Sequence, residues 1–443
     1  MPPSSPSSPA NSRVRIDRPG LILAAACWIL WFSWVQWRQP TPLVDEQWHQ
    51  AAIAAFMDGG APSQALPMLP GYHRLVAVLG FALEPSLFWS RTVTLLLGLA
   101  MLAVYARIPR TEISAENDRP RSALPLALLP LALPFSALVY TDIPSLAFVI
   151  AAVWAVRTDR FGLSALFAAA ACAVRQSNLV WLGLLALLAA LRVIRSHGPE
   201  GPPSSLWTQL RRTIVPAVIQ DQGLRRRLLV ALSGYGLVGL GFGLYFVIRG
   251  SLLFDDVQEN VPHLNPGHLY LFGALTWLLW LPLWVERLPG LWRSGLESAR
   301  RRQGTAAMVA GIFAGLSWLL FLTYSLPHPW NQVGLFWHNL PLMLMLVVPA
   351  LRVLGIVMSL AALVLWIDLY RHRPRPELFL LAVFTVLFLL PHGLVEARYF
   401  LIPAVLVHLF VDLSARQEAR LLKWFALLNV LAIGAYSVGL GMW

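Results

Sequence analysis

The stretch LILAAACWILWFSWVQW, residues 21–37, is apolar apart from one serine and one glutamine, and it carries no charge. A continuous apolar run of this length is long enough to cross a bilayer as a helix. Trp31, Trp34 and Trp37 crowd its C-terminal end, and tryptophans are enriched where a helix leaves the membrane for water. No small-residue cleavage pattern follows the run, so we expect an uncleaved anchor rather than a signal peptide.

Apolar runs of this kind recur along the whole chain. Hydrophobic residues make up 57% of the 443 residues and charged residues only 13%, whereas soluble domains carry about 25% charged residues. The runs are continuous rather than alternating, which excludes an outer-membrane β-barrel. The sequence therefore predicts an all-α polytopic membrane protein with about thirteen transmembrane helices. The expected spans after residues 21–37 are 87–106, 123–138, 142–156, 160–174, 178–194, 228–248, 268–285, 305–325, 351–370, 376–391, 398–414 and 421–440.

The expected domain organisation is simple. Residues 1–19 are rich in proline and serine and then basic, which is typical of a disordered cytoplasmic tail. Residues 20–443 are expected to form a single transmembrane domain. Its longer connections are a first outer loop with interfacial helices at 38–85, a cytoplasmic loop at 196–227 and an outer loop at 249–267.

Basic residues are distributed unevenly between the two ends of these spans. The net charge of +12 comes almost entirely from arginine, since Lys423 is the only lysine. With the N-terminus in the cytoplasm, most of the 34 Lys and Arg residues fall on cytoplasmic loops, as the positive-inside rule requires. We therefore expect a multi-pass protein of a bacterial cell inner membrane with a cytoplasmic N-terminus. The excess of basic over acidic residues indicates how the protein is oriented in the membrane. It also indicates contact with anionic membrane lipid rather than with nucleic acid.

The unusual polar clusters fall on the opposite, arginine-poor face, which we expect to be periplasmic. The first is Val44-Asp45-Glu46-Gln47-Trp48-His49, just after the first span. A carboxylate at such a boundary can abstract a proton from a hydroxyl group, the more so where partial burial raises its pKa. The alternative is a solvated helix N-terminus, where acids favour the helix dipole. Adjacent helical residues point about 100° apart, so only one of Asp45 and Glu46 is expected to face a site.

Two further clusters lie in short turns between spans on the same face. In the turn 140–142, Asp142 either contacts a ligand or caps the following helix. In the turn 175–178, Arg175 suits a phosphate because a guanidinium donates paired hydrogen bonds and stays charged. The alternative is an arginine that reaches lipid headgroups. The amide side chains beside Arg175 add hydrogen-bond donors, which favours the phosphate.

Two later clusters complete this face. Asp256 and His263 stand at loose spacing in the loop 249–267, which favours an acceptor-binding loop over a metal site. Glu396 lies two residues before Arg398, which indicates either a structural ion pair or a second phosphate contact. The chain has no glycine-rich dinucleotide motif, no phosphate-binding P-loop and no CxxC pair. An activated substrate is therefore expected to come from the membrane.

Taken in order, these blocks resemble the dolichyl-phosphate-glucose-dependent alpha-1,2-glucosyltransferases, a family with the GT-C glycosyltransferase fold. The resemblance rests on Val44–His49, Pro67–Tyr72, Tyr140–Ser145 and Arg175–Trp181, with weaker similarity at Phe254–Tyr270 and Glu396–Tyr399. It extends from about residue 20 to about residue 410. The last block reads Glu-Ala-Arg-Tyr where the family has Asp-Asn-Arg-His-Tyr, and the middle loop lacks the family's lysine and one histidine. These departures concern the acceptor side.

The resemblance implies an inverting glycosyltransferase that moves a hexose, glucose above all, from a polyprenyl-phosphate sugar donor to a lipid-linked or glycan acceptor. It implies Asp45 as the catalytic base with Glu46 beside it, and Arg175 and Arg398 at the donor phosphate. No metal ion or other cofactor is implied, because the phosphate leaving group needs cationic stabilisation rather than a general acid. The implied substrate-binding residues are His49, Tyr72, Tyr140, Asp142, Gln176, Asn178, Asp256, His263, His392 and Glu396.

Two other functions fit parts of the pattern. A polytopic lipid or sugar transporter, or a flippase, would place its binding residues near the bilayer midplane and carry inverted repeats. Here the polar clusters crowd one face and no repeat is visible. A GT-C enzyme that uses another sugar and a protein acceptor is the second alternative, and the sequence separates it poorly from the first hypothesis.

Overall fold

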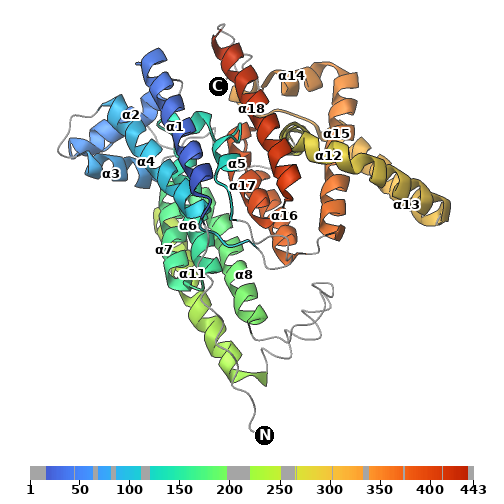
Figure 1. Cartoon of the computed structure of the whole chain (residues 1–443), viewed down its shortest axis with the longest axis horizontal. Coiled ribbons are helices and arrows are strands. Elements are labelled where there is room, and N and C mark those ends of the chain that lie inside the picture. Colours follow the sequence, from blue (N-terminus) through green and yellow to red (C-terminus); the bar gives the residue numbers. More distant parts are fainter. Residues whose placement is uncertain are drawn as a thin grey trace.

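The protein is seen here in a computed structural model, in which every regular element of the described residues is a helix (Figure 1). The described residues are 16–43, 45–62, 68–80, 86–110, 120–196, 220–250, 265, 267–301, 303–332, 339–372, 375–411 and 413–437. The helices are α1 (Arg18–Arg38), α2 (Glu46–Met57), α3 (Gly71–Leu79), α4 (Leu87–Tyr105), α5 (Leu124–Ala127), η2 (Pro134–Ala137), α6 (Asp142–Arg157), α7 (Phe161–Val174), η3 (Gln176–Asn178), α8 (Leu179–Arg195), α11 (Gln222–Arg249), α12 (Gly267–Arg301), α13 (Gln303–Thr323), η6 (Pro329–Gln332), α14 (Asn339–Val347), α15 (Pro349–His372), α16 (Pro376–Leu389), η7 (Ala397–Phe400), α17 (Leu401–Phe410) and α18 (Ala415–Ser437).

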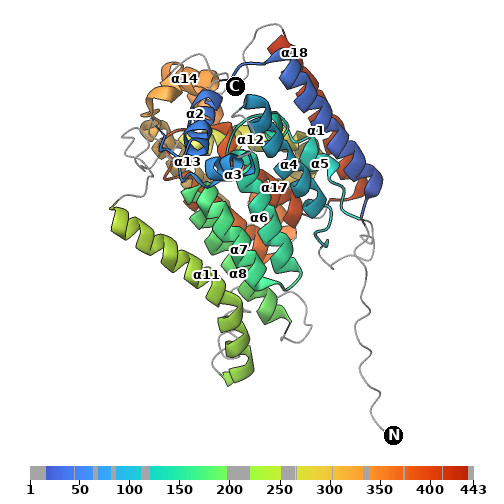
Figure 2. The ribbon, with the colours of Figure 1, turned by 90° about the vertical axis from the view of Figure 1, so that its left-hand side faces the viewer.

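The helices have the length and composition of a polytopic membrane protein, as the sequence predicts. Within the described residues, the segments long and apolar enough to cross a membrane are Arg18–Arg38, Leu87–Tyr105, Gln176–Arg195, Gln222–Arg249, Gly267–Glu297 and Pro349–Arg371. Shorter apolar helices accompany them. Helix α11, at the margin of the bundle in Figure 2, exposes Leu240 and Val247 and buries few side chains. Such an apolar outer surface fits contact with lipid rather than with water.

The same helices separate the predicted site from the arginines assigned to the cytoplasmic face. Helix α6 begins at Asp142 and ends at Arg157, and α8 ends at Arg195. Arg398 precedes α17, whose last turn receives hydrogen bonds from Arg121 to the carbonyl oxygens of His408 and Leu409. The polar clusters therefore lie at one end of the bundle and these arginines at the other.

One predicted span is not a continuous helix. Residues 123–138 form the single turn α5, a series of turns and η2, although the sequence predicts a transmembrane helix there. Pro125, Pro130 and Pro134 explain the difference, because each proline lacks a backbone donor and disrupts the helical hydrogen-bond ladder. Carbonyl oxygens of this irregular segment accept hydrogen bonds from side chains: the Trp28 indole donates to Ala127 at 2.9 Å, the Trp31 indole to Pro134 at 3.4 Å and the Asn429 amide to Leu128 at 2.7 Å.

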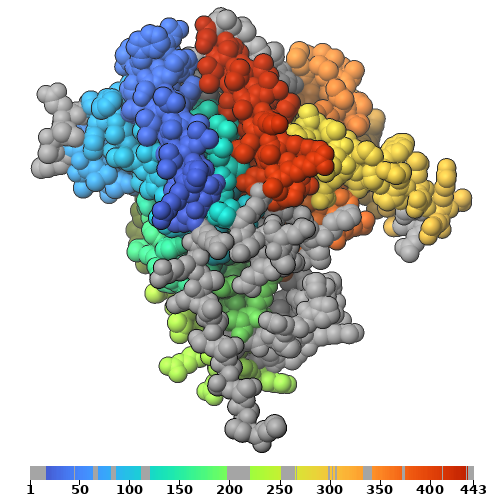
Figure 3. Space-filling model, viewed as in Figure 1, coloured from blue at the N-terminus to red at the C-terminus, as the bar shows by residue number. Residues whose placement is uncertain are grey.

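This irregular segment still joins the two ends of the bundle. Arg121, just before it, reaches the C-terminal end of α17, while Tyr140, just after it, lies under the Arg398 guanidinium. Figure 3 shows its atoms between α1 and α18, and both helices contact it. Irregular backbone at membrane depth is tolerated where protein surrounds it, and most of this segment is buried.

Two helices lie in the segment 38–85, where the sequence predicts interfacial helices. Helix α2 begins at Glu46, the second residue of the acidic pair, and α3 packs against both α2 and α7. The contact with α7 depends on Gly71, since a Cβ atom there would lie 2.4 Å from the carbonyl oxygen of Ala173. Only glycine permits this approach. The packing places α2 and α3 beside the end of α7, where Arg175 follows.

Candidate active site

The two carboxylates of the acidic pair have different surroundings. Glu46 is fully buried and forms a two-pronged ion pair with the equally buried Arg91, with Nε–Oε1 and Nη2–Oε2 distances of 2.9 and 2.6 Å. Its oxygens also accept hydrogen bonds from the backbone N–H groups of Leu43 and Val139, at 2.9 and 2.7 Å. Arg91 in turn donates to the carbonyl oxygens of Gln39 and Thr41. Glu46 thus ties the end of α1, the start of α2 and the turn before α6 together.

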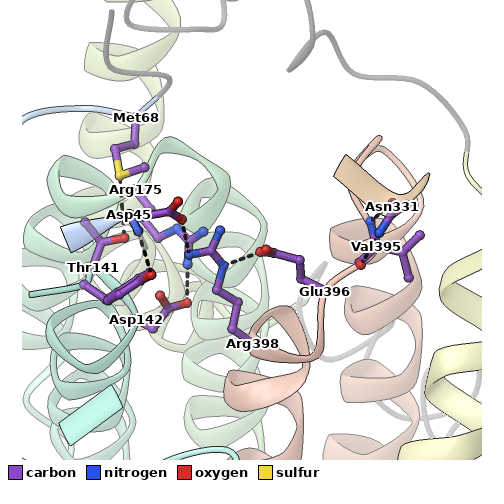
Figure 4. A network of polar contacts seen from close by, with 10 residues as sticks. Asp45, Met68, Thr141, Asp142, Arg175, Asn331, Val395, Glu396 and Arg398 are labelled. Carbon is purple, nitrogen blue, oxygen red and sulfur yellow. Dashed lines mark hydrogen bonds and ion pairs between the residues drawn. The ribbon is translucent and has the colours of Figure 1, made fainter. Parts of the chain in front are cut away.

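Asp45 points the other way, toward open space. It stands at the N-cap of α2 without making a capping hydrogen bond, and its side chain is 40% exposed. One carboxylate oxygen lies 3.3 Å from Nη1 of Arg398, and its backbone N–H donates to the Tyr140 hydroxyl at 3.2 Å. Asp45 is therefore the accessible carboxylate of the pair, next to a fixed positive charge (Figure 4).

Arg398 lies between Asp45 and Glu396, to which its Nε donates (Figure 4). Its guanidinium also rests 5.4 Å from the centre of the Tyr140 ring, a cation–π contact. Burial raises the pKa of the Glu396 carboxyl, against the opposing effect of Arg398. The geometry fits both interpretations of the Glu396–Arg398 pair, because a guanidinium that donates Nε to Glu396 and one Nη to Asp45 has further N–H groups that can bind an anion.

The loop that carries Glu396 is held from two other elements. The Asn331 side chain pairs with the backbone of Val395 in both directions, donating to its carbonyl oxygen and accepting from its N–H at 2.8 Å each. Asn265 donates to the carbonyl oxygen of Gly393. One ring nitrogen of His268 lies 2.9 Å from the carbonyl oxygen of His392. These contacts orient Glu396 and Arg398 from η6 and from the start of α12.

Arg175, in the turn between α7 and α8, faces Asp142 at the start of α6. Arg175 follows α7 in an extended conformation, which sends its side chain back over the start of α6. There its Nη1 lies 2.5 Å from Oδ1 of Asp142, a residue only 4% exposed (Figure 4). The capping alternative for Asp142 does not hold, because Thr141 is the N-cap residue of α6 and Asp142 is its first helical residue.

The two amides beside Arg175 act within the protein. The Gln176 side-chain oxygen accepts a hydrogen bond from the backbone N–H of Leu69. Asn178 donates to the carbonyl oxygen of Ala171 at 2.7 Å and to the Ser145 hydroxyl at 2.8 Å. Both N–H groups of Asn178 therefore have partners within the protein, and its predicted role in substrate binding stays a prediction.

Two histidines form a buried pair beneath this region. His49 and His73 lie with Nδ1 and Nε2 2.8 Å apart, and the His49 ring also packs on Tyr140. Burial lowers the pKa of both rings, that of His73 to about 4. Tyr72 is fully buried beside them and bonds the Thr94 hydroxyl at 2.6 Å. The pair is therefore neutral at pH 7 and braces α2 against α3.

The low pKa of His73 predicts a loss of stability in acid. The unfolded chain takes up this proton near the ordinary pKa of about 6.5, whereas the folded protein does so only near pH 4. Because the unfolded state binds the proton first, the free energy of unfolding falls as the pH drops through this window. We expect a loss of about 2 kcal/mol from this group between pH 7.5 and pH 5, measured as a lower unfolding midpoint in detergent.

His73→Gln provides the comparison for this prediction. The variant keeps a polar side chain but has no proton to take up, so its midpoint should fall less over the same pH range. A residual loss is expected, because burial also lowers the pKa of His49 and that of His392, the latter to about 3. Equal losses in the variant and the wild type would contradict the assignment.

His392 lies on the other side of Arg175. Its ring packs on Tyr399 with centres 4.6 Å apart, and its Nδ1 lies 2.6 Å from the carbonyl oxygen of Phe388. The Arg175 guanidinium sits 5.4 Å from the centre of the same Tyr399 ring. His392 is thus joined to Arg175 through Tyr399 rather than directly.

The remaining predicted site residues, Asp256 and His263, lie outside the described residues. Within the described part of the chain, no group of three or more His, Cys, Asp or Glu side chains is placed to hold a metal ion. The structure brings together Asp45, Asp142, Arg175, Glu396 and Arg398, with Tyr140 below them. This group, here named the acid–arginine cluster, draws its members from four separate parts of the sequence.

Sequence reasoning missed Arg91, His73 and Asn331 as determinants of the site. Arg91 could have been identified from the sequence, because an arginine inside an apolar run needs a partner in the protein. Asn331 stands in a polar stretch of the sequence, but nothing in the sequence indicates that it would bind the backbone of Val395. His73 has no distinctive neighbours in sequence, and only the packing of α3 on α2 identifies it.

A bundle of apolar helices with a charged, partly exposed cluster at one end defines a multi-pass membrane protein with its candidate site at the end of the spans. Residues 39–409 match the DIE2/ALG10 family, and the chain belongs to this family. The match confirms the family resemblance of the sequence motifs. It covers the whole acid–arginine cluster and both buried pairs beside it.

Curated relatives share a single description, "Dol-P-Glc:Glc(2)Man(9)GlcNAc(2)-PP-Dol alpha-1,2-glucosyltransferase". The relative from Yarrowia lipolytica is 25% identical over 291 residues, covering 60% of this chain and 52% of the relative. The relative from Candida glabrata is 29% identical over 287 residues, covering 60% and 51%. The relative from Arabidopsis thaliana is 24% identical over 206 residues, covering 36% and 40%. The chain spans about half the length of the first two, and no solved structure matches it.

Proposed function

We propose that this protein is an inverting glycosyltransferase that moves glucose from a polyprenyl-phosphate sugar to a lipid-linked or glycan acceptor. One observation carries the proposal: a half-exposed carboxylate, Asp45, stands beside Arg398 and in one cluster with Arg175 at one end of a membrane bundle. A general base for the acceptor hydroxyl and cations for a phosphate are what this reaction needs. The printed names of the relatives support the same donor, acceptor type and alpha-1,2 linkage.

In the proposed reaction, Asp45 is the general base. Its carboxylate takes the proton of the acceptor hydroxyl as that oxygen attacks the anomeric carbon of the donor sugar. The bond between that carbon and the phosphate oxygen breaks on the opposite face, so the configuration inverts. The lipid phosphate leaves with the bonding electron pair, and the proton stays on Asp45. Glu46 takes no part in this step, because its oxygens are buried and already bound by Arg91 and two backbone N–H groups.

The donor phosphate is proposed to bind Arg175 and Arg398. Both are paired with carboxylates in this structure, so an incoming phosphate competes with Asp142 for Arg175 and with Asp45 for Arg398. The Asp45 contact is the easier to exchange, since it is a single bond of 3.3 Å at a half-exposed side chain. Exchange at Arg398 frees the Asp45 carboxylate for the acceptor. Donor binding and preparation of the base are thereby coupled.

The proposed location is the periplasmic face of a bacterial inner membrane, with a cytoplasmic N-terminus. The separation of the acid–arginine cluster from the arginines at the opposite helix ends supports this orientation through the positive-inside rule. A polyprenyl-phosphate sugar then needs no soluble nucleotide, because its tail lies in the bilayer and its phosphate at the interface.

The test is a transfer assay with the purified full chain in liposomes. Supplied with a polyprenyl-phosphate glucose and a lipid-linked oligosaccharide, the protein should form a new glycosidic bond, detected as a hexose mass increase on the acceptor. Movement of labelled lipid across the bilayer without any new glycosidic bond would instead indicate a transporter.

Arg175→Gln tests the phosphate contact. A hydrogen bond to a charged partner contributes about 1.5–3 kcal/mol, so kcat/KM for the donor should fall roughly 10- to 100-fold. The matched control is Arg74→Gln, which removes an exposed arginine that contacts only Phe56 among the contacts described and should react like the wild type. Unchanged donor kinetics in Arg175→Gln would remove Arg175 from the phosphate site.

A further inference from the structure

A small pocket lies beside the acid–arginine cluster, between α6, η3, α16, η7 and α17. Asp142, Ser145, Arg175, Asn178 and Arg398 supply its polar lining, and Phe388 and Ile402 are among its apolar walls. We name it the hydroxyl pocket for the chemistry argued below. Two of its lining residues, Asp142 and Asn178, are more than nine-tenths buried and each keeps an oxygen atom without a partner among the described residues.

The orientation of the Asn178 amide is fixed by its neighbours. Its nitrogen lies 2.7 Å from the carbonyl oxygen of Ala171, which can only accept a hydrogen bond. The amide nitrogen must therefore face Ala171, and it also donates to the Ser145 hydroxyl. The flipped orientation would place two acceptors against each other. Oδ1 of Asn178 is consequently the unpartnered atom, and it is an acceptor.

Asp142 provides the second acceptor. Its Oδ1 binds Arg175, while Oδ2 is buried and has no hydrogen-bond partner in the described part of the chain. Burying an acceptor without a donor is costly, and more so for a charged oxygen. Two such acceptors beside one pocket indicate a ligand with two hydrogen-bond donors. The adjacent arginines exclude a cation as that ligand, because they would repel it.

We propose that the hydroxyl pocket binds a vicinal diol, the pair of adjacent hydroxyl groups on one edge of the transferred sugar ring. One hydroxyl donates to Oδ2 of Asp142 and its neighbour donates to Oδ1 of Asn178. The pocket takes only this edge, since its small size excludes the whole ring. The adjacent arginines then stand at the ring edge closest to the phosphate. The proposal rests on the proposed function and adds which part of the donor sets specificity.

The experiment measures donor binding and transfer separately. The full chain in detergent is titrated with polyprenyl-phosphate glucose and with the donors that lack one hydroxyl at carbon 2, 3, 4 or 6 of the glucose. Two adjacent deoxy donors should bind roughly 10- to 100-fold more weakly than the parent donor, and the other two should bind nearly as well. Equal losses of affinity for all four deoxy donors would overturn the proposal and indicate that the pocket binds water instead.

Two variants locate the effect. Asn178→Ser removes the amide oxygen and should abolish the discrimination against one of the two adjacent deoxy donors. Asn429→Ser is the matched control, because it makes the same change at a buried amide that bonds the carbonyl oxygen of Leu128 and does not line the pocket, and it should discriminate like the wild type. Unfolding midpoints confirm that each variant folds. Wild-type discrimination against all four deoxy donors in a folded Asn178→Ser variant would overturn the proposal.

The outcomes separate the two levels of argument. Selective binding of the diol edge without transfer to any acceptor would overturn the proposed function and support the pocket. Transfer with no selectivity among the deoxy donors would support the proposed function and overturn the pocket proposal. No binding of any polyprenyl-phosphate sugar would overturn both.

Discussion

Asp45→Asn should lower kcat for sugar transfer by about 10³-fold while donor affinity changes little. The asparagine has nearly the same shape and still accepts a hydrogen bond from Arg398, but it cannot take the proton of an acceptor hydroxyl at neutral pH. General-base contributions of this kind amount to about 10²–10⁴-fold. The measurement is single-turnover transfer in liposomes, combined with equilibrium binding of the donor.

Asp58→Asn is the control for this loss. Asp58 ends the same helix, α2, and is exposed, so its replacement removes an acidic charge nearby without touching the acid–arginine cluster. We expect wild-type turnover in this variant. Turnover above about a tenth of the wild-type rate in Asp45→Asn would exclude Asp45 as the base.

Glu46→Gln and Arg91→Met should each destabilise the fold by about 3–5 kcal/mol. Each variant leaves the opposite charge fully buried without its counter-ion, and water cannot reach either side chain. The glutamine also replaces one oxygen that accepts a backbone N–H with a nitrogen that cannot accept it. The loss is measured as the unfolding midpoint and as the yield of folded protein in detergent.

The double variant Glu46→Leu/Arg91→Leu separates pairing from packing. Replacing both charges by apolar groups removes the buried ions together, so part of the lost stability should return relative to the single variants. The backbone donors of Leu43 and Val139 remain unsatisfied, which limits the recovery. Single variants with near-wild-type midpoints would show that Glu46 is not the structural tie described here.

In the segment 123–138, apolar composition alone predicts a continuous helix that the structure does not contain. Its composition is that of a membrane span, and the sequence alone predicts a helix there. Three prolines prevent one, and carbonyl oxygens of the irregular segment accept hydrogen bonds from Trp28, Trp31 and Asn429 instead. Those donors lie about 100 residues before and about 300 residues after the segment, at sequence separations of 99, 103 and 301. Local reasoning cannot identify such partners.

The sequence by itself determined the membrane class, nearly all the helices, the polar clusters and their common face, and the family. These features depend on composition, on runs of apolar residues and on local motifs, which do not require knowledge of distant contacts. Within the acidic pair, however, the chemistry of the two neighbours follows from residues far along the chain. Arg91 buries Glu46, and Arg398 meets Asp45 at the surface of the site. Only the tertiary structure brings these partners together, because they pair across helices that are distant in sequence.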